Sequence, residues 1–185
     1  MTYKRLYEQV EENYVQIKKI ELPKGIQQNA FQGKSLLNMG TPIIYLKNED
    51  GYLPDFLSGG TSMLVISSKV KKFLMNSSEK EYLECIETNV ISKKGNIENY
   101  FLLNILSLFE CFDFKNSVYE LYEEYDNAFK NIKIMKIDSS KVNNRKLFHM
   151  KEFLVEIFIE QSFVEQMLAA GIRDMRPIAL KGAVN

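Results

Sequence analysis

The chain has 185 residues, which is enough for one domain with a full hydrophobic core. Its 45% hydrophobic and 26% charged residues are ordinary for a globular protein, and 24 Lys and Arg balance 24 Asp and Glu. Because the charges balance, the protein has no net charge that would attract nucleic acid, a membrane surface or an acidic substrate. Any electrostatic recognition therefore has to come from local groups of charges.

The cysteine content and the start of the chain bear on the cellular compartment. Cys85 and Cys111 are the only cysteines, and a secreted, disulfide-stabilised domain would show more. Residues 1–8 carry charges where an export signal needs an apolar segment. We therefore expect a cytoplasmic protein.

The first part of the chain, residues 1–54, is predicted to be rich in loops. Residues 3–20 fit one face of a helix about as well as the alternation of a strand, so the type of this element stays open. Residues 22–52 contain repeated Pro and Gly, and only Thr41 to Leu46 has the pattern of a strand. Long irregular segments often carry binding sites, although a surface cover without such a role is the commoner case.

Residues 55–91 are predicted to form a strand, a helix and a second strand. Met63 to Ile66 is a short apolar run, and the serines that follow it, Ser67 and Ser68, are typical of the start of a helix. Apolar residues then recur at helical spacing, and residues 82–91 alternate as a second strand does.

Residues 147–181 show the same order of elements. Val155 to Ile159 is predicted as a strand, and Ser162 to Glu165 has the pattern of a capping box. Gly171 is placed to end the helix before a closing strand over residues 174–180. Aligning the two segments pairs Val65 with Ile159, Ser68 with Ser162, Val70 with Val164 and Leu74 with Leu168. These pairs predict an internal duplication.

Residues 96–114 are predicted to form a buried central helix. They include Tyr100 to Phe114, the most uniformly apolar run of the chain, which is longer than strands usually are and rich in Leu rather than Val. The predicted fold class is therefore α+β, with a mixed or antiparallel sheet packed on a buried central helix and two similar strand-helix-strand units. We expect a single domain over residues 1–185.

No catalytic constellation is visible in the sequence. His149 is the only histidine, and no spacing of Cys and His fits a zinc site. No serine lies in a nucleophile elbow, and the glycines lack the spacing of a phosphate-binding loop. We therefore expect no catalytic, cofactor-binding or metal-binding residues. A small hydrolase or ligand-binding protein with a pocket near His149 stays an alternative, although a packed histidine is the commoner case.

An acidic and tyrosine-rich run follows the apolar segment. Its residues are Tyr119, Glu120, Tyr122, Glu123, Glu124, Tyr125 and Asp126. Tyr is enriched in protein interfaces, and carboxylates steer a basic partner, so this run is the predicted partner-binding site. A solvated face of a helix is the alternative explanation.

The order of several short blocks resembles that of the immunity protein 11 family, formerly a domain of unknown function. The blocks are Asp55–Leu57, Leu64–Val70, Tyr100–Leu106, Leu147–Phe148, Phe158–Ile159 with Phe163–Val164, and Ala170–Pro177. They cover residues 55–177. Near Asp174 the family tends to have a glycine, and the aromatic residue that often follows is missing from this chain.

The resemblance implies a small cytosolic immunity protein of a bacterial polymorphic or contact-delivered toxin system. Such a protein binds the cognate toxin encoded beside it and neutralises that toxin, and the family brings no catalytic residues to this chain. We therefore expect a toxin protein as partner, no enzyme activity, and neither nucleic acid nor a membrane as partner. A homodimeric structural module stays a further alternative.

Overall fold

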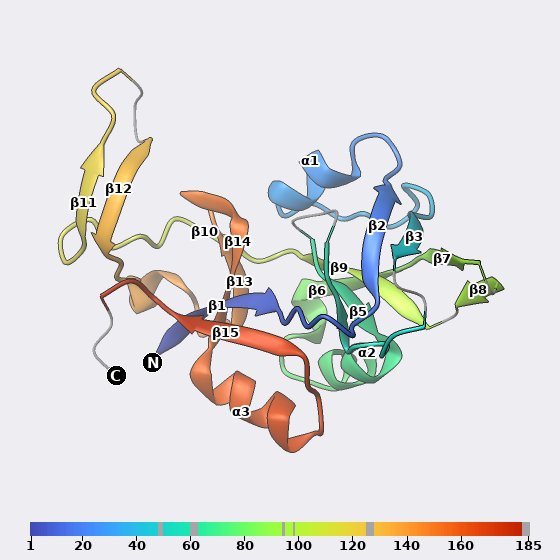
Figure 1. Cartoon of the computed structure of the whole chain (residues 1–185). Coiled ribbons are helices and arrows are strands. Elements are labelled where there is room, and N and C mark those ends of the chain that lie inside the picture. The colour runs from blue at the N-terminus through green and yellow to red at the C-terminus, as the bar shows by residue number, and fades with distance from the viewer. Residues whose placement is uncertain (48–49, 60–62, 94, 98, 125–127, 183–185) are drawn as a thin grey trace.

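The computed structural model describes residues 1–47, 50–59, 63–93, 95–97, 99–124 and 128–182. Over these residues the fold is α+β and consists mostly of strands, which form four mixed or antiparallel sheets accompanied by three short helices (Figure 1). The predicted α+β class is confirmed, whereas the predicted architecture around a central helix is not.

The largest sheet joins the two ends of the chain. Its strands, in order across the sheet, are β10 (Leu108–Phe109), β13 (Leu147–Met150), β14 (Phe153–Glu160), β1 (Tyr3–Glu8) and β15 (Met175–Ala179). Neighbouring strands are antiparallel, except that β10 runs parallel to β13. The helix α3 (Gln161–Ala169) follows β14 directly. The ambiguous segment over residues 3–20 therefore begins as a strand, because β1 pairs with a neighbour on each side.

A second sheet replaces the predicted central helix. Its strands, in order, are β4 (Phe56–Leu57), β5 (Val65–Ser67), β9 (Tyr100–Ile105) and β6 (Leu83–Glu87), and the helix α2 (Ser68–Met75) follows β5. All neighbours in this sheet are antiparallel.

The helix predicted over residues 96–114 is wrong, because its apolar run belongs to two sheets. Residues 100–105 form β9, whose side chains are buried on both faces of its sheet. Leu103 packs in a core cluster with Phe163 of α3, and Leu102 packs in another with Ile44. A strand covered on both faces reads as a continuous apolar run rather than an alternating one. The chain then crosses over, and β10 pairs with β13 of the five-stranded sheet.

A third sheet covers the second one. Its strands, in order, are β2 (Gln16–Glu21), β3 (Ile43–Lys47), β7 (Asn89–Ser92) and β8 (Gly95–Ile97), with the short helix α1 (Ile26–Phe31) between β2 and β3 in the chain. The strand predicted near residues 41–46 is confirmed as β3. The strand predicted over residues 82–91 is instead two strands, β6 and β7, which lie in different sheets.

Three core clusters hold these layers together. The first lies between the five-stranded sheet and the second sheet, and it includes side chains of α2 and α3. The second lies between the second and third sheets. The third lies on the other face of the five-stranded sheet, at the base of the hairpin formed by β11 (Val118–Leu121) and β12 (Phe129–Ile134). Short 3-10 turns occur at Lys80–Tyr82 and Ser139–Lys141.

Each predicted segment contains a strand, a helix and a later strand, as β5, α2 and β6 in the second sheet and as β14, α3 and β15 in the five-stranded sheet. In the second sheet β9 lies between β5 and β6, and in the five-stranded sheet β1 lies between β14 and β15. The two segments therefore share an order of elements, while their internal duplication stays a prediction.

The helices of these segments differ in their first residues. Ser67 caps α2 and its Oγ accepts a hydrogen bond from the Val70 amide, as expected. The capping box at Ser162 is wrong, because α3 already begins at Gln161. The pairing of Leu74 with Leu168 is also wrong, since Leu168 is 44% exposed whereas Met167 is 2% exposed.

Candidate functional site

The β11–β12 hairpin projects from the body of the molecule, at the upper left of Figure 1. Its strands are antiparallel and pair Val118 with Ile134 and Leu121 with Phe129, with two register irregularities between these pairs. Within the described residues it is a two-stranded sheet of its own. An isolated hairpin is marginally stable in water, so its position has to be fixed by packing at its base.

An aromatic cluster supplies that packing. Phe112, which is 1% exposed, is its centre. The centroid of the Phe112 ring lies 4.8 Å from that of Phe114, 5.5 Å from that of Tyr119, 4.8 Å from that of Phe129 and 5.8 Å from that of Phe153. Phe153 belongs to β14, so the cluster connects both strands of the hairpin to the five-stranded sheet. The hairpin is therefore anchored at its base.

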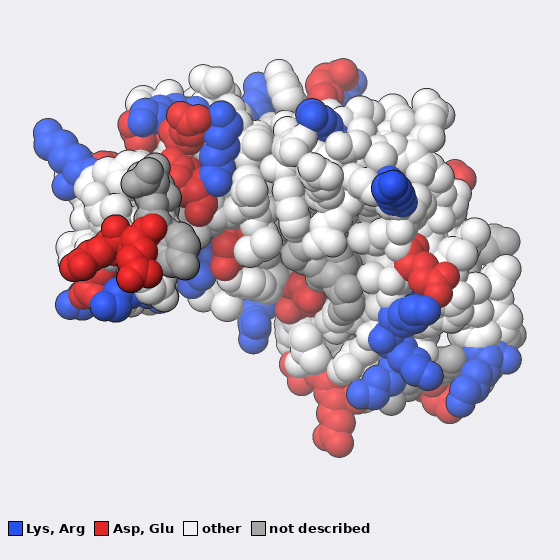
Figure 2. Space-filling model, turned by 90° about the horizontal axis from the view of Figure 1, so that it is seen from above, with Lys and Arg blue, Asp and Glu red and all other residues white. Residues whose placement is uncertain are grey.

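The outer part of the hairpin exposes apolar and acidic side chains together. Leu121 is 38% exposed and Tyr122 is 49% exposed, whereas Val118, which is 46% exposed, lies at the base end of β11. Glu123 and Glu124 are exposed beyond them. Figure 2 shows acidic side chains gathered at the left of the view, over the hairpin. Lysines of β12, among them Lys133, lie on the same hairpin. Exposed aromatic and aliphatic side chains are typical of a surface that binds a protein partner, and charged side chains are typical of its rim.

The described residues of the predicted partner-binding run, 119–124, therefore lie on a projecting hairpin and not on a helix. Tyr119 contributes its ring to the aromatic cluster, and Glu120 lies 3.7 Å from the Lys133 ammonium on the neighbouring strand. Tyr125 and Asp126 fall outside the described residues. Glu123 and Glu124 are the run's two exposed carboxylates with no ion pair to another described residue.

A polar network around two buried carboxylates, which we term the Asp55–Asp174 network, was not predicted from the sequence. The Asp174 carboxylate accepts hydrogen bonds from the Tyr14 hydroxyl at 2.8 Å, the Tyr52 hydroxyl at 3.2 Å and the Asp55 amide at 2.9 Å. Asp55 in turn accepts from Ser67 Oγ and lies 2.6 Å from the Lys69 ammonium. The hydrogen bond to Asp174 and partial burial raise the pKa of Tyr14 to about 12.

This network ties three distant parts of the chain together and has a structural role. It joins the loop-rich first part, the start of α2 and the turn after α3. Asp174 has a φ of 64°, a conformation that glycine adopts without strain and that Asp tolerates better than most residues. In the sequence, the one signal for this network is that Asp55 and Asp174 fall in two of the family-like blocks, Asp55–Leu57 and Ala170–Pro177.

His149 is a packed side chain of β13. It is 6% exposed, and its Nδ1 donates a hydrogen bond to the Glu156 carbonyl at 2.9 Å. Burial lowers the pKa of His149 below its ordinary value. The arrangement corresponds to the commoner of the two expectations for this residue, a packed histidine.

Lowering the pH should reduce the free energy of unfolding, because His149 is buried in its neutral form. Because the pKa is lower in the folded protein, the unfolded chain binds the proton first, so stability is kept above about pH 6.5 and falls as the pH drops below it. Urea unfolding between pH 7.5 and 5 should show a smaller loss for His149→Asn than for the wild type, by up to about 1.4 kcal/mol per pH unit. Equal pH slopes for both proteins would contradict this assignment.

The described residues contain no candidate metal site and no candidate membrane-spanning helix. No group of three His, Cys, Asp or Glu side chains is placed there to hold a metal ion. Among the described helices, none has the length and hydropathy that a membrane span requires.

The anchored hairpin, with its exposed aromatic, aliphatic and acidic side chains, defines a candidate protein-binding module. The chain belongs to the Imm11 immunity protein family, whose model matches residues 7–182. A search of curated proteins gave no match. Membership in an immunity protein family implies toxin neutralisation and a cognate toxin as partner.

Proposed function

We propose that this protein neutralises its cognate bacterial toxin by direct contact, without chemistry of its own, and that the β11–β12 hairpin is a principal contact surface. The family match supports a toxin partner. The observation that carries the choice of surface is the projecting hairpin, which combines exposed Leu121 and Tyr122 with the carboxylates of Glu123 and Glu124.

The chemistry of the hairpin favours a basic surface on the toxin. Carboxylates at a rim accelerate encounter with a positively charged partner, while aromatic and aliphatic side chains contribute most of the energy once solvent is excluded. A hairpin held at its base by packed aromatic rings loses little conformational freedom on binding, which favours affinity.

The acidic end of the hairpin can be tested with a matched pair of variants. The double variant Glu123→Gln, Glu124→Gln should slow association with the toxin about fivefold to tenfold at low salt, because steering by charge is lost. The control is Glu11→Gln, Glu12→Gln, which removes two adjacent exposed carboxylates from a different part of the surface. Rates should be measured by stopped flow at several salt concentrations.

The two variants should respond differently to salt. The hairpin variant should lose part of the salt dependence of association, whereas the control should keep the rate and salt dependence of the wild type. If both variants behave as the wild type does, the acidic end of the hairpin is not part of the interface.

A further inference from the structure

The five-stranded sheet opens between two of its central strands. β1 and β14 pair from Tyr3 with Glu160 to Arg5 with Phe158. Beyond Arg5, β1 continues to pair with β15 on its other side. β14 is irregular at the same level, since the consecutive residues His149 and Met150 of β13 pair with Ile157 and Phe153. Such bulges often occur beside functional sites, where they redirect side chains.

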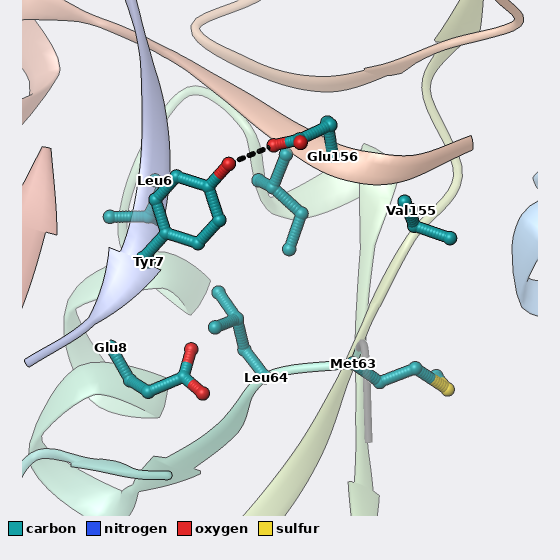
Figure 3. A pocket seen from close by; sticks show the side chains of 8 residues that line it. Leu6, Tyr7, Glu8, Met63, Leu64, Val155 and Glu156 are labelled. Atoms are coloured by element: carbon teal, nitrogen blue, oxygen red, sulfur yellow. Dashed lines mark hydrogen bonds between the residues drawn. The ribbon is translucent and has the colours of Figure 1, made fainter. Parts of the chain in front are cut away.

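A cavity of about 250 Å³ occupies the opening (Figure 3). Leu6, Tyr7 and Glu8 of β1 lie on one side and Val155, Glu156 and Ile157 of β14 on the other, and Met63 and Leu64 complete the lining. Val155 is 59% exposed although it is apolar, so this part of the lining faces solvent. The volume is below that of a typical pocket for a drug-sized ligand, about 300–1,000 Å³, and suits a single side chain.

Both charged side chains in the lining are acidic. Glu156 is already engaged: one carboxylate oxygen accepts a hydrogen bond from the Tyr7 hydroxyl, and the other lies 3.5 Å from Arg5 Nη1. The guanidinium carbons of Arg5 and Arg176 each lie 5.9 Å from the centroid of the Tyr7 ring, and neither arginine lines the cavity. These contacts hold Tyr7 and Glu156 in place across the opening.

Glu8 differs from Glu156 because it forms no ion pair with another described residue. Its carboxylate points toward Leu64 in Figure 3. The cavity therefore combines apolar walls with one carboxylate that has no counter-charge. A long basic side chain matches both features, because its methylene stem packs on apolar walls while its charged end pairs with a carboxylate.

We propose that this cavity receives an arginine side chain of a partner protein, with its guanidinium paired to Glu8 and its stem against Leu64 and Val155. The identity of the partner as the toxin rests on the proposed function, whereas the chemistry of the cavity does not. The cavity would thus be a second contact point, distinct from the hairpin.

The cavity can be tested without the toxin. Butylguanidinium reproduces the stem and charged end of arginine, and butylurea has a similar shape without the charge. In methyl NMR titrations, butylguanidinium should cause saturable shifts of the Leu64, Val155 and Ile157 methyl signals, and butylurea should bind about tenfold more weakly. Glu8→Gln should weaken butylguanidinium binding by a similar factor, whereas Glu11→Gln should leave it unchanged. Equal binding of both probes, or no saturable shifts, would overturn the proposal.

The toxin provides an independent second measurement. If the cavity is used in the complex, Glu8→Gln should raise the dissociation constant about tenfold, and Glu11→Gln should leave it unchanged. A wild-type complex that Glu8→Gln does not weaken would overturn the role of the cavity while leaving the proposed function intact. A toxin that does not bind the wild type at all would overturn the proposed function and this partner, while the probe titrations would still decide the chemistry of the cavity.

Discussion

Replacing Asp174 with alanine should lower the free energy of unfolding by about 3 kcal/mol, the largest loss we expect from a single polar residue of this protein. Asp174 is 9% exposed and accepts hydrogen bonds from Tyr14, Tyr52 and the Asp55 amide. Alanine would leave these donors without their acceptor, one of them a buried backbone amide, and would place a Cβ-bearing residue without a local hydrogen bond at a φ of 64°.

A short series separates the two causes of this loss. Asp174→Gly removes the acceptor but relieves the backbone strain, and Asp174→Asn keeps one acceptor oxygen at a tolerated φ. The expected order of stability in urea unfolding is wild type, then Asn, then Gly, then Ala. Asn144→Ala measures the backbone cost alone, about 1 kcal/mol, because Asn144 is exposed and has a φ of 58°. If Asp174→Gly were as stable as the wild type, the hydrogen bonds would carry no net stability.

Shortening Phe112 should destabilise the protein and loosen the hairpin. Phe112 is 1% exposed and contacts rings from both hairpin strands and from β14. Phe112→Leu should cost about 1–3 kcal/mol through lost volume and lost ring contacts. Because the hairpin is held mainly by this cluster, its amides should exchange with solvent faster than those of the main sheet.

Phe56 provides the matched control. It is also 1% exposed, but it lies in the core cluster between the five-stranded sheet and the second sheet. Phe56→Leu should cost a similar amount of stability without a selective effect on the hairpin. Hydrogen exchange and toxin binding should distinguish the two variants, since only Phe112→Leu should speed exchange in β11 and β12 and weaken the complex. Identical exchange patterns would contradict the anchoring role of Phe112.

Local signals predicted the short elements well. Ser67 follows a strand and caps α2, and Gly171 ends α3 with a φ of 79° while the Ile172 amide bonds back to the Met167 carbonyl. These features depend on a few neighbouring residues, so they can be read from sequence. The capping box predicted at Ser162 failed because α3 begins one residue earlier, at Gln161, after Glu160, which makes no side-chain capping hydrogen bond.

The apolar run at residues 100–114 was wrongly predicted as a helix, because its burial depends on parts of the chain far from the run itself. Its strand, β9, is buried on both faces because the first and second core clusters lie on either side of its sheet. Nothing in the run itself tells whether a partner sheet covers the second face. The environment of the Asn104 side chain also depends on distant parts of the chain, because its amide donates hydrogen bonds to the Lys34 carbonyl and to the Glu84 carboxylate.

The candidate binding surface could be predicted in part. The alternation of Tyr and Glu after residue 118 marked an unusual segment, but its place on a projecting hairpin depends on the aromatic cluster around Phe112. The cavity beside Glu8 was not predictable, because it arises where β1 and β14 separate, and these strands are more than a hundred residues apart in the chain.

Neutralisation of a toxin by direct binding is the function that we propose for this protein. The most direct measurement is co-purification of the tagged protein with its cognate toxin domain, followed by an assay of toxin activity with and without the bound protein. We expect a stable complex in which the toxin is inactive. Dissociation of the complex should release an unmodified toxin that regains its activity. Activity that persists in the complex, or a protein that forms only a homodimer and does not bind the toxin, would contradict the proposed function.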